Sequence, residues 1–218
     1  MNFATSYLGL KLTNPIVICA SPFCDDLYVA RQLQDAGAAA VVMRSLFAEQ
    51  FDPAVMEPAS LPATEAPRAK VPFPASADYQ FSPEKYLRQL EALKRTLTIP
   101  VLASLNGHRP GGWSDYARQL ESAGADAVEL NIYQVVTSPN VAASKIETEI
   151  LDTLGSVVDA VRIPVAVKLS PFYTSVAQLA VALEQRGAAG VVVFNRFYQP
   201  DVNLEVLEVQ PQLRLSDP

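Results

Sequence analysis

The fold is decided by the stretch from Arg162 to Asn195. It begins Arg162-Ile-Pro-Val-Ala-Val-Lys-Leu-Ser-Pro171 and ends Leu183-Glu-Gln-Arg-Gly187-Ala-Ala-Gly-Val-Val-Val-Phe-Asn195. Both ends contain a short apolar run, and the residues between them are typical of a helix that closes at Gly187. Consecutive apolar positions favour strands buried on both faces, as in a parallel sheet covered by helices. The stretch therefore predicts a strand, a helix and a second parallel strand.

The same unit occurs twice more, because Pro15 precedes Gly37 and Pro100 precedes Gly124 at nearly the same spacing. A repeat of this length is the first feature to look for in a sequence. The repeat predicts an α/β fold of the (β/α)8 TIM-barrel type, incomplete in that six parallel strands can be read. The predicted strands are Ile16–Ala20, Ala39–Met43, Val101–Leu105, Ala127–Leu130, Val165–Leu169 and Val191–Phe194.

Polar side chains lie at or directly after the end of every predicted strand. In a parallel barrel these positions meet at the C-terminal rim, where barrel enzymes place their sites. A simpler explanation is that polar residues merely mark the ends of strands, but six occurrences favour a shared site. The residues concerned are Ser21, Arg44, Ser45, Asn106, Asn131, Lys168 and Asn195.

The remaining elements fit one barrel domain over residues 1–218. A short hairpin is expected between Thr5 and Leu12 over the barrel floor. Helices are expected over about 27–36, 83–94, 113–122, 144–161 and 176–186. A Pro-rich insertion at about 47–82 interrupts the rhythm, and we interpret it either as a cover for the site or as a mobile insertion.

Composition limits the classes of function. The 218 residues are 50% hydrophobic with a net charge of −6, which argues against nucleic acid or a membrane surface as partner. No apolar run reaches the roughly 18 residues of a membrane helix, and no secretory signal is seen at the N-terminus. A cytoplasmic protein is expected, with a small-molecule substrate and either a homo-oligomer or a completing chain as partner.

The two cysteines and the single histidine carry little chemistry. Cys19 is expected to be a small buried hydrophobe, and a disulfide with Cys24 is the less favoured alternative. Without a second cysteine pair or a histidine cluster, no zinc site is predicted. His108 lies in a Gly/Pro turn beside the rim, so it is read as a surface residue more readily than as an acid–base group.

Lys168 is the sharpest single feature, because burial of a lysine is costly unless the charge is paired or used. One interpretation is a salt bridge to an acid on a neighbouring strand, such as Glu129. The other is that the ammonium faces a delocalised anion, as at the N1–C2 edge of a reduced flavin. No Ser-His-Asp arrangement or pair of rim carboxylates is evident, which disfavours acyl transfer and glycoside hydrolysis.

These residues also carry a family resemblance. The chain resembles the dihydroorotate dehydrogenase family, most closely its dihydroorotate dehydrogenase-like branch. The matching elements span nearly the whole chain: Asn14-Pro15, Ala20-Ser21, Arg44-Ser45, Glu129-Leu130-Asn131, Val167-Lys168-Leu169 and Asn195.

The resemblance implies an FMN-binding oxidoreductase that acts on CH–CH groups, as in pyrimidine biosynthesis. Hydride would pass between a small cyclic or unsaturated substrate and flavin N5. The implied cofactor contacts are Ala20, Ser21, Ser45, Asn131 and Lys168. The implied substrate contacts are Arg44, Asn106, Asn131 and Asn195. Lys168 would stabilise the flavin charge, and Ser138 is the candidate base.

Three departures from the family pattern qualify this expectation. Arg44 stands where the family usually has a lysine, and the two side chains are not equivalent. Four additional residues separate Asn131 from Ser138, so Ser138 could equally belong to a simple turn. The last two strands, with their Gly-rich phosphate site, are not readable. The alternative is therefore a truncated, non-catalytic barrel or interaction subunit without tight FMN binding.

Overall fold

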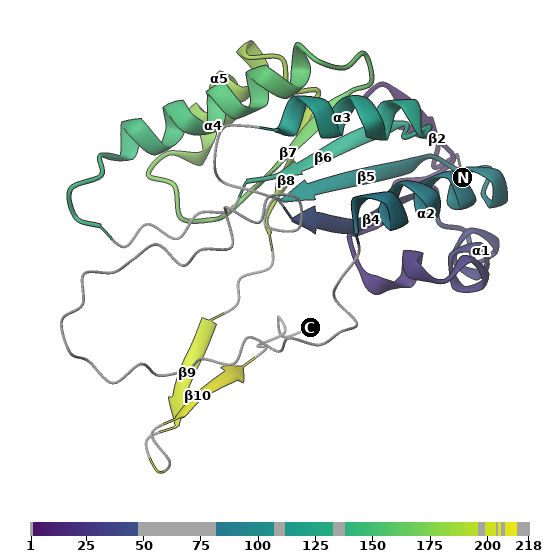
Figure 1. Cartoon of the computed structure of the whole chain (residues 1–218), viewed down its shortest axis with the longest axis horizontal. Coiled ribbons are helices and arrows are strands. Elements are labelled where there is room, and N and C mark those ends of the chain that lie inside the picture. Colours follow the sequence, from purple (N-terminus) through teal and green to yellow (C-terminus); the bar gives the residue numbers. More distant parts are fainter. Residues whose placement is uncertain are drawn as a thin grey trace.

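A computed structural model describes residues 2–47, 82–106, 112–132, 138–195, 199–203, 205 and 208–212. Its central feature is a six-stranded parallel sheet in the order β3-β4-β5-β6-β7-β8, which curls into half of a barrel (Figure 1). The strands are β3 (Val17–Ile18), β4 (Ala40–Phe47), β5 (Val101–Asn106), β6 (Ala127–Asn131), β7 (Val165–Leu169) and β8 (Gly190–Val193). All six predicted strands are confirmed. Sequential strands are neighbours, as right-handed strand–helix–strand crossovers produce.

Helices follow the strands along the chain and cover one face of the sheet (Figure 1). They are α1 (Leu27–Asp35), α2 (Pro83–Thr96), α3 (Trp113–Ser122), α4 (Ala143–Val158) and α5 (Val176–Gln185), with a short 3-10 helix η1 (Pro22–Asp25) before α1. The predicted helices are therefore confirmed, with ends that differ by a few residues. Asp26 caps α1 through its carboxylate, and Ser82 caps α2 through its hydroxyl.

Gly37, Gly124 and Gly187 follow three of these helices with φ values of +105°, +96° and +104°. Such left-handed backbone is costly for residues with a Cβ, so glycine ends the helix and turns the chain toward the next strand. The shared glycine explains why one unit is repeated along the sequence.

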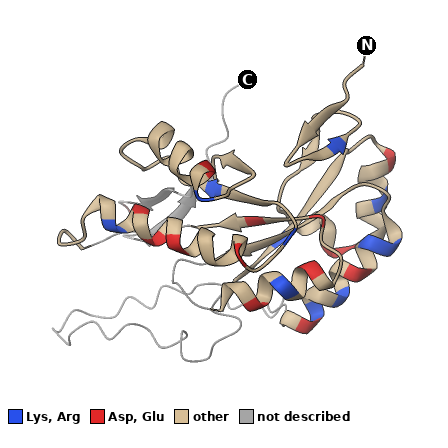
Figure 2. Ribbon diagram, turned by 90° about the horizontal axis from the view of Figure 1, so that it is seen from above, with Lys and Arg blue, Asp and Glu red and all other residues tan. Residues whose placement is uncertain are grey.

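The outer face of the sheet forms the main core. Val41, Leu105, Val128 and Val167 are fully buried there against the helices. Charged residues lie mainly on the helices and few lie on the strands of the sheet (Figure 2). Apolar residues on both faces of each strand explain the continuous hydrophobic runs in the sequence.

The inner face carries a second, smaller core. The hairpin of β1 (Thr5–Tyr7) and β2 (Leu10–Leu12) places Leu8 and Leu12 against inner residues of the sheet, and this confirms the predicted hairpin. The residues of this core in or next to the sheet are Ala39, which directly precedes β4, and Ala40, Val42, Leu102, Ala127 and Ala166. They occupy the N-terminal part of the strands, so the inner surface nearer the strand C-termini is left for other residues.

A second antiparallel pair, β9 (Gln199–Asn203) and β10 (Glu208–Gln212), follows the sheet in the chain. No strand pair was predicted for this part of the chain. The Pro-rich segment from 48 to 81 and His108 lie outside the described residues, so the expectations for them stay predictions. No helix in the described part of the chain combines the length and apolar character needed to cross a membrane.

Two local expectations were wrong. Cys19 is exposed, because β3 contains only two residues and ends before it. Arg44 and Ser45 lie inside β4, because pairing with β5 continues to Phe47. In both cases the length of the strand depends on pairing with the neighbouring strand. Local hydrophobicity carries no information about that pairing.

Candidate functional site

The inner surface of the sheet changes from apolar to polar toward the C-terminal ends of the strands. Ser104 pairs in register with Glu129, and Asn131 pairs with Lys168, so the polar side chains lie on adjacent strands β5, β6 and β7. Side chains of one parity in a strand face the same side. The predicted residues Asn106, Asn131 and Lys168 are thus brought to one region.

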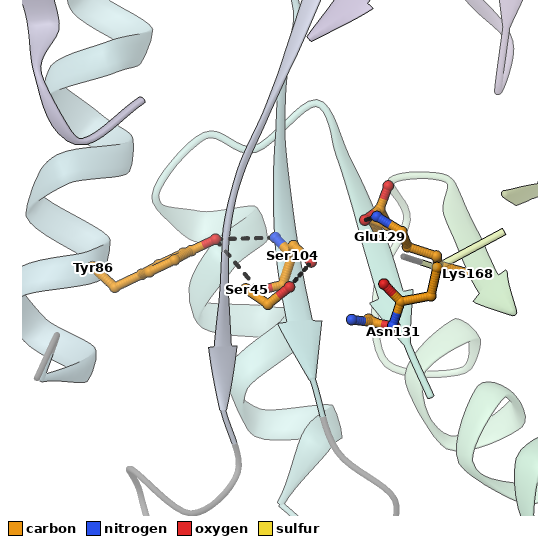
Figure 3. Close-up of polar contacts among 7 residues, drawn as sticks. Ser45, Tyr86, Ser104, Glu129, Asn131 and Lys168 are labelled. Atoms are coloured by element: carbon orange, nitrogen blue, oxygen red, sulfur yellow. Dashed lines mark hydrogen bonds and ion pairs between the residues drawn. The ribbon is translucent and has the colours of Figure 1, made fainter. Parts of the chain in front are cut away.

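Lys168 and Glu129 form an ion pair in this region. Lys168 Nζ lies 3.2 Å from Glu129 Oε1, and the two side chains are only 11% and 4% exposed. Figure 3 shows the two side chains side by side above Asn131. The salt bridge weighed from sequence is therefore present. The carboxylate fixes the position of the ammonium, and it also offsets the positive charge that an anion would meet there.

Asn195 joins the cluster from the segment after β8. Its Nδ2 donates to Asn131 Oδ1 at 3.0 Å, while its backbone N donates to Leu169 O at 2.7 Å. Because Asn131 is buried and Asn195 half-buried, the two amides hold each other in one orientation. With this contact made, Asn195 Oδ1 can still accept and Asn131 Nδ2 can still donate a hydrogen bond to a heterocycle.

Ser45 and Ser104 form the opposite side of the polar surface. Their Oγ atoms are 2.8 Å apart, and Ser104 is fully buried (Figure 3). A hydroxyl pair can donate or accept, so it can adapt to either kind of ligand atom.

The loop after β3 brings Ala20 and Ser21 to the same end of the sheet. Both are half-buried, and Ser21 Oγ is a buried atom without a hydrogen-bond partner among the described residues. A buried hydroxyl without a partner is uncommon and favours a missing polar ligand group at this position.

Arg44 takes a different position from the other predicted residues. Its guanidinium forms an ion pair with Asp25 of η1. Burial raises the pKa of Asp25, and the positive charge of Arg44 acts in the opposite direction. Arg44 therefore holds the loop after β3, and its role as a substrate contact stays a prediction.

Ser138 lies apart from these contacts in a short turn. It is exposed, and its Oγ accepts a hydrogen bond from Asn140 N at 3.4 Å. This contact is typical of a serine turn and gives the hydroxyl no basic partner. Its role as catalytic base stays a prediction.

A pocket of about 340 Å³ opens beside the ion pair, between the hairpin and the inner face of the sheet. Burial raises the pKa of the Tyr7 phenol, and the negative charge of Glu129 adds to this effect. The lining residues are Thr5, Ser6, Tyr7, Leu12, Pro15, Val17, Cys19, Val42, Glu129, Lys168 and Val192. The sequence did not reveal this pocket, because the hairpin and β8 meet only in the fold.

Sequence comparison identifies proteins similar to this chain. The catalytic subunit of dihydroorotate dehydrogenase B (NAD(+)) from Methanosarcina acetivorans is 27% identical over 205 residues, covering 90% of this chain. The same-named protein from Methanocella arvoryzae is 28% identical over 188 residues, covering 86% of it. The chain is similar in sequence to proteins of the dihydroorotate dehydrogenase family. The predicted resemblance is confirmed at this level, while the dihydroorotate dehydrogenase-like branch stays a prediction.

The match to the dihydroorotate dehydrogenases has limits. The chain spans 62% and 60% of the length of these two relatives. A dihydroorotate dehydrogenase A (fumarate) from Lactobacillus delbrueckii is 30% identical over 105 residues, or 45% of this chain and 33% of that protein. No family model matches the chain.

Comparison with solved structures supports the fold alone. Phosphonopyruvate hydrolase, crystallised with oxalate and Mg²⁺, superposes with a TM-score of 0.51 over 84% of this chain and 59% of that one. Its sequence identity is 16%, so only the barrel architecture is shared.

Proposed function

We infer that the chain is part of an FMN-dependent oxidoreductase that resembles dihydroorotate dehydrogenase and acts on a small cyclic or unsaturated substrate. The observation that carries this proposal is the buried Lys168 at the end of β7, next to the amides of Asn131 and Asn195. The relatives named dihydroorotate dehydrogenase support the same reaction class.

The described residues fit the ring of a flavin. The Lys168 ammonium can face negative charge at the N1–C2 edge, and Asn131 can donate to a ring carbonyl. Ser21 Oγ and the Ser45 hydroxyl supply further polar atoms on the other side of the same surface. FMN, when bound, supplies the atom N5, which accepts or gives the hydride.

The phosphate end of FMN is not matched by the three repeated glycines. Gly37, Gly124 and Gly187 lie at the ends of helices that lead into strands, at the opposite end of the sheet from Lys168. A phosphate cradle of backbone N–H groups at the C-terminal rim is therefore not formed by these glycines. Tight binding of FMN is expected to need such a cradle.

The substrate is expected beside the flavin ring, where Asn195 and Asn131 can hold a planar heterocycle. Asn106 ends β5 in register with Asn131, which supports a place for it at the same surface. Ser138 is proposed as a secondary contact, as the base that removes the proton from the substrate carbon. Arg44, paired with Asp25 of η1, would act on the site only by holding the loop after β3.

A second candidate function is a non-catalytic barrel segment that binds a completing chain or another copy of itself. Both outer strands support it, because Ile16 before β3 and Val193 of β8 are 57% and 61% exposed despite their apolar side chains. In the described sheet β3 pairs only with β4 and β8 only with β7. Unpaired edges of this kind favour further strand pairing.

The test is the visible absorption spectrum of the purified chain with and without added FMN, together with quenching of FMN fluorescence. Binding that weakens at least about tenfold in Lys168→Met supports the flavin site, since this factor corresponds to about 1.4 kcal/mol. Lys145→Met is the matched control, because Lys145 is 67% exposed on α4. A colourless chain that ignores FMN and elutes as an oligomer would favour the second function.

A further inference from the structure

The register between β4 and β5 shifts by one residue beside the candidate site. Val42 pairs with Leu102, and the next regular pair is Ser45 with Ser104. Two residues of β4, Met43 and Arg44, thus oppose the single residue Ala103 of β5, which defines a β-bulge.

The burial pattern shows the consequence for the side chains of β4. Val42 packs in the inner core, whereas Met43 and Leu46 both pack in the outer core against the helices. Regular alternation from Met43 would turn Arg44 inward and Ser45 outward. The bulge reverses this, so that Ser45 reaches Ser104 at 2.8 Å and Arg44 pairs with Asp25.

The hydroxyl of Tyr86 fills the backbone gap that the bulge leaves on β5. Ser104 N donates to Tyr86 OH at 3.0 Å, and Tyr86 OH lies 3.4 Å from Ser104 O as a donor. Figure 3 shows the ring entering from α2 on the helix side, with its hydroxyl at Ser104. Burial raises the pKa of this phenol well above its ordinary range, so the hydroxyl keeps its proton.

The helix α2 also holds the partner of Arg44. Gln89 Nε2 donates to Cys24 O at 2.8 Å and to Asp25 O at 3.1 Å. One helix therefore fixes both the bulge, through Tyr86, and the loop that receives the Arg44 guanidinium, through Gln89.

We propose that Tyr86 is a positioning residue that maintains the β4 bulge and thereby decides which of the two neighbours, Arg44 or Ser45, faces the inner surface. The expected effect of Tyr86 on flavin binding rests on the proposed function, in which Ser45 contacts the flavin. Its effect on the register does not depend on the flavin.

The first test uses Tyr86→Phe without any ligand. Loss of the hydroxyl leaves two buried backbone groups of Ser104 without partners, and these favour a return to the regular ladder. The ladder would turn Arg44 inward, away from Asp25. Thermal unfolding of Asp25→Asn, Arg44→Gln and the double variant measures the Asp25–Arg44 coupling in both backgrounds.

The expected result is a clear coupling in the wild-type background and its loss in the Tyr86→Phe background. Tyr28→Phe is the matched control, because it also removes a tyrosine hydroxyl, and Tyr28 is 71% exposed on α1. A purely structural Tyr86 would lower the Tm and leave the coupling unchanged, and that outcome would overturn the proposal.

A second measurement covers the case in which Tyr86→Phe does not fold. In the wild-type chain, NMR should detect a nuclear Overhauser effect between the Tyr86 ring protons and the Ser104 amide proton. Absence of that contact, with the Ser104 amide protected by β4 instead, would contradict the bulge assignment.

FMN binding then separates this proposal from the proposed function. If the wild-type chain binds FMN, Tyr86→Phe should weaken binding by about tenfold relative to Tyr28→Phe. If the wild-type chain shows no FMN binding at all, not even the weak binding expected from the contacts to the ring, the proposed function fails while the coupling experiment still decides the role of Tyr86. Unchanged FMN affinity despite lost coupling would overturn the link between the bulge and the flavin site.

Discussion

Lys168 Nζ and Glu129 Oε1 lie 3.2 Å apart on the adjacent strands β7 and β6, in the middle of the inner face of the sheet. The two residues share a buried environment, in which neither charge is stable without the other. Glu129 thereby holds the ammonium in place at the site proposed for the flavin ring.

Removal of the Glu129 charge should destabilise the fold. Glu129→Gln keeps the size of the side chain and leaves a buried ammonium without a counter-charge, which costs about 3 kcal/mol of unfolding free energy. Urea unfolding measures the change. Glu91→Gln is the control, because the Glu91–Arg95 pair is 3.7 Å long and exposed, and it should cost under about 0.5 kcal/mol.

The Lys168–Glu129 ion pair also predicts that a second substitution restores stability to Glu129→Gln. Glu129→Gln combined with Lys168→Met removes both charges, so the double variant should be more stable than Glu129→Gln alone. Equal stability of Glu129→Gln and Glu91→Gln would instead mean that the Lys168 charge is already stabilised by water.

The lack of a side chain at Gly190 should favour docking of the N-terminal hairpin. A Cβ at position 190 would lie 2.6 Å from Leu8 Cδ2, inside any normal contact distance. Gly190→Ala should therefore cost about 1–3 kcal/mol through overpacking. In urea unfolding, Leu8→Ala should relieve part of this cost, giving a double variant less unstable than the sum of the single changes. If the unfolding free energy changes of the two single variants are simply additive, Leu8 does not pack against position 190 and the hairpin lies elsewhere.

The two cysteines should differ in reactivity. Cys19 is exposed, whereas Cys24 is buried and its Sγ contacts Val42 O at 3.7 Å. A thiol reagent should label one site per native chain quickly and the second only on unfolding. Cys19→Ser should abolish the fast phase. Two fast thiols would show that the loop after β3 opens readily.

Cys24 should also make stability fall at alkaline pH. Burial raises the pKa of its thiol from 9.0 to about 11, with smaller contributions from Asp25 and Cys19. Below pH 9 the thiol is neutral in both states, and its full contribution is present. Between pH 9 and 11 only the unfolded chain ionises, so stability is lost, by up to about 2–3 kcal/mol. Urea unfolding of Cys24→Ala should show a weaker decline than the wild-type chain over this range.

The strand–helix repeat was predictable from the sequence because its signals are local. The apolar runs at Pro15, Pro100 and Pro164 and the helix-ending glycines at Gly37, Gly124 and Gly187 act within a few residues. Asn131 and Lys168 could be assigned to one rim, since parallel strands end on the same side.

The exact arrangement of the site was not predictable in the same way. Hydrophobic periodicity placed both Arg44 and Ser45 after a strand and did not tell which of them faces the inner surface. The bulge that turns Ser45 inward depends on Tyr86, from a helix that begins at Pro83. The sequence allowed two environments for Lys168, a salt bridge or a delocalised anion. The pairing of β6 with β7 in the structure places Lys168 in contact with Glu129.

The sequence alone thus determined a parallel strand–helix fold with a polar rim, because hydrophobic period and helix caps are encoded over short distances. Tertiary structure decided which side chains face the inner surface, how the Lys168 charge is balanced and why Cys19 is exposed. These outcomes depend on strand register and edge position, which are set by contacts between residues far apart in the chain.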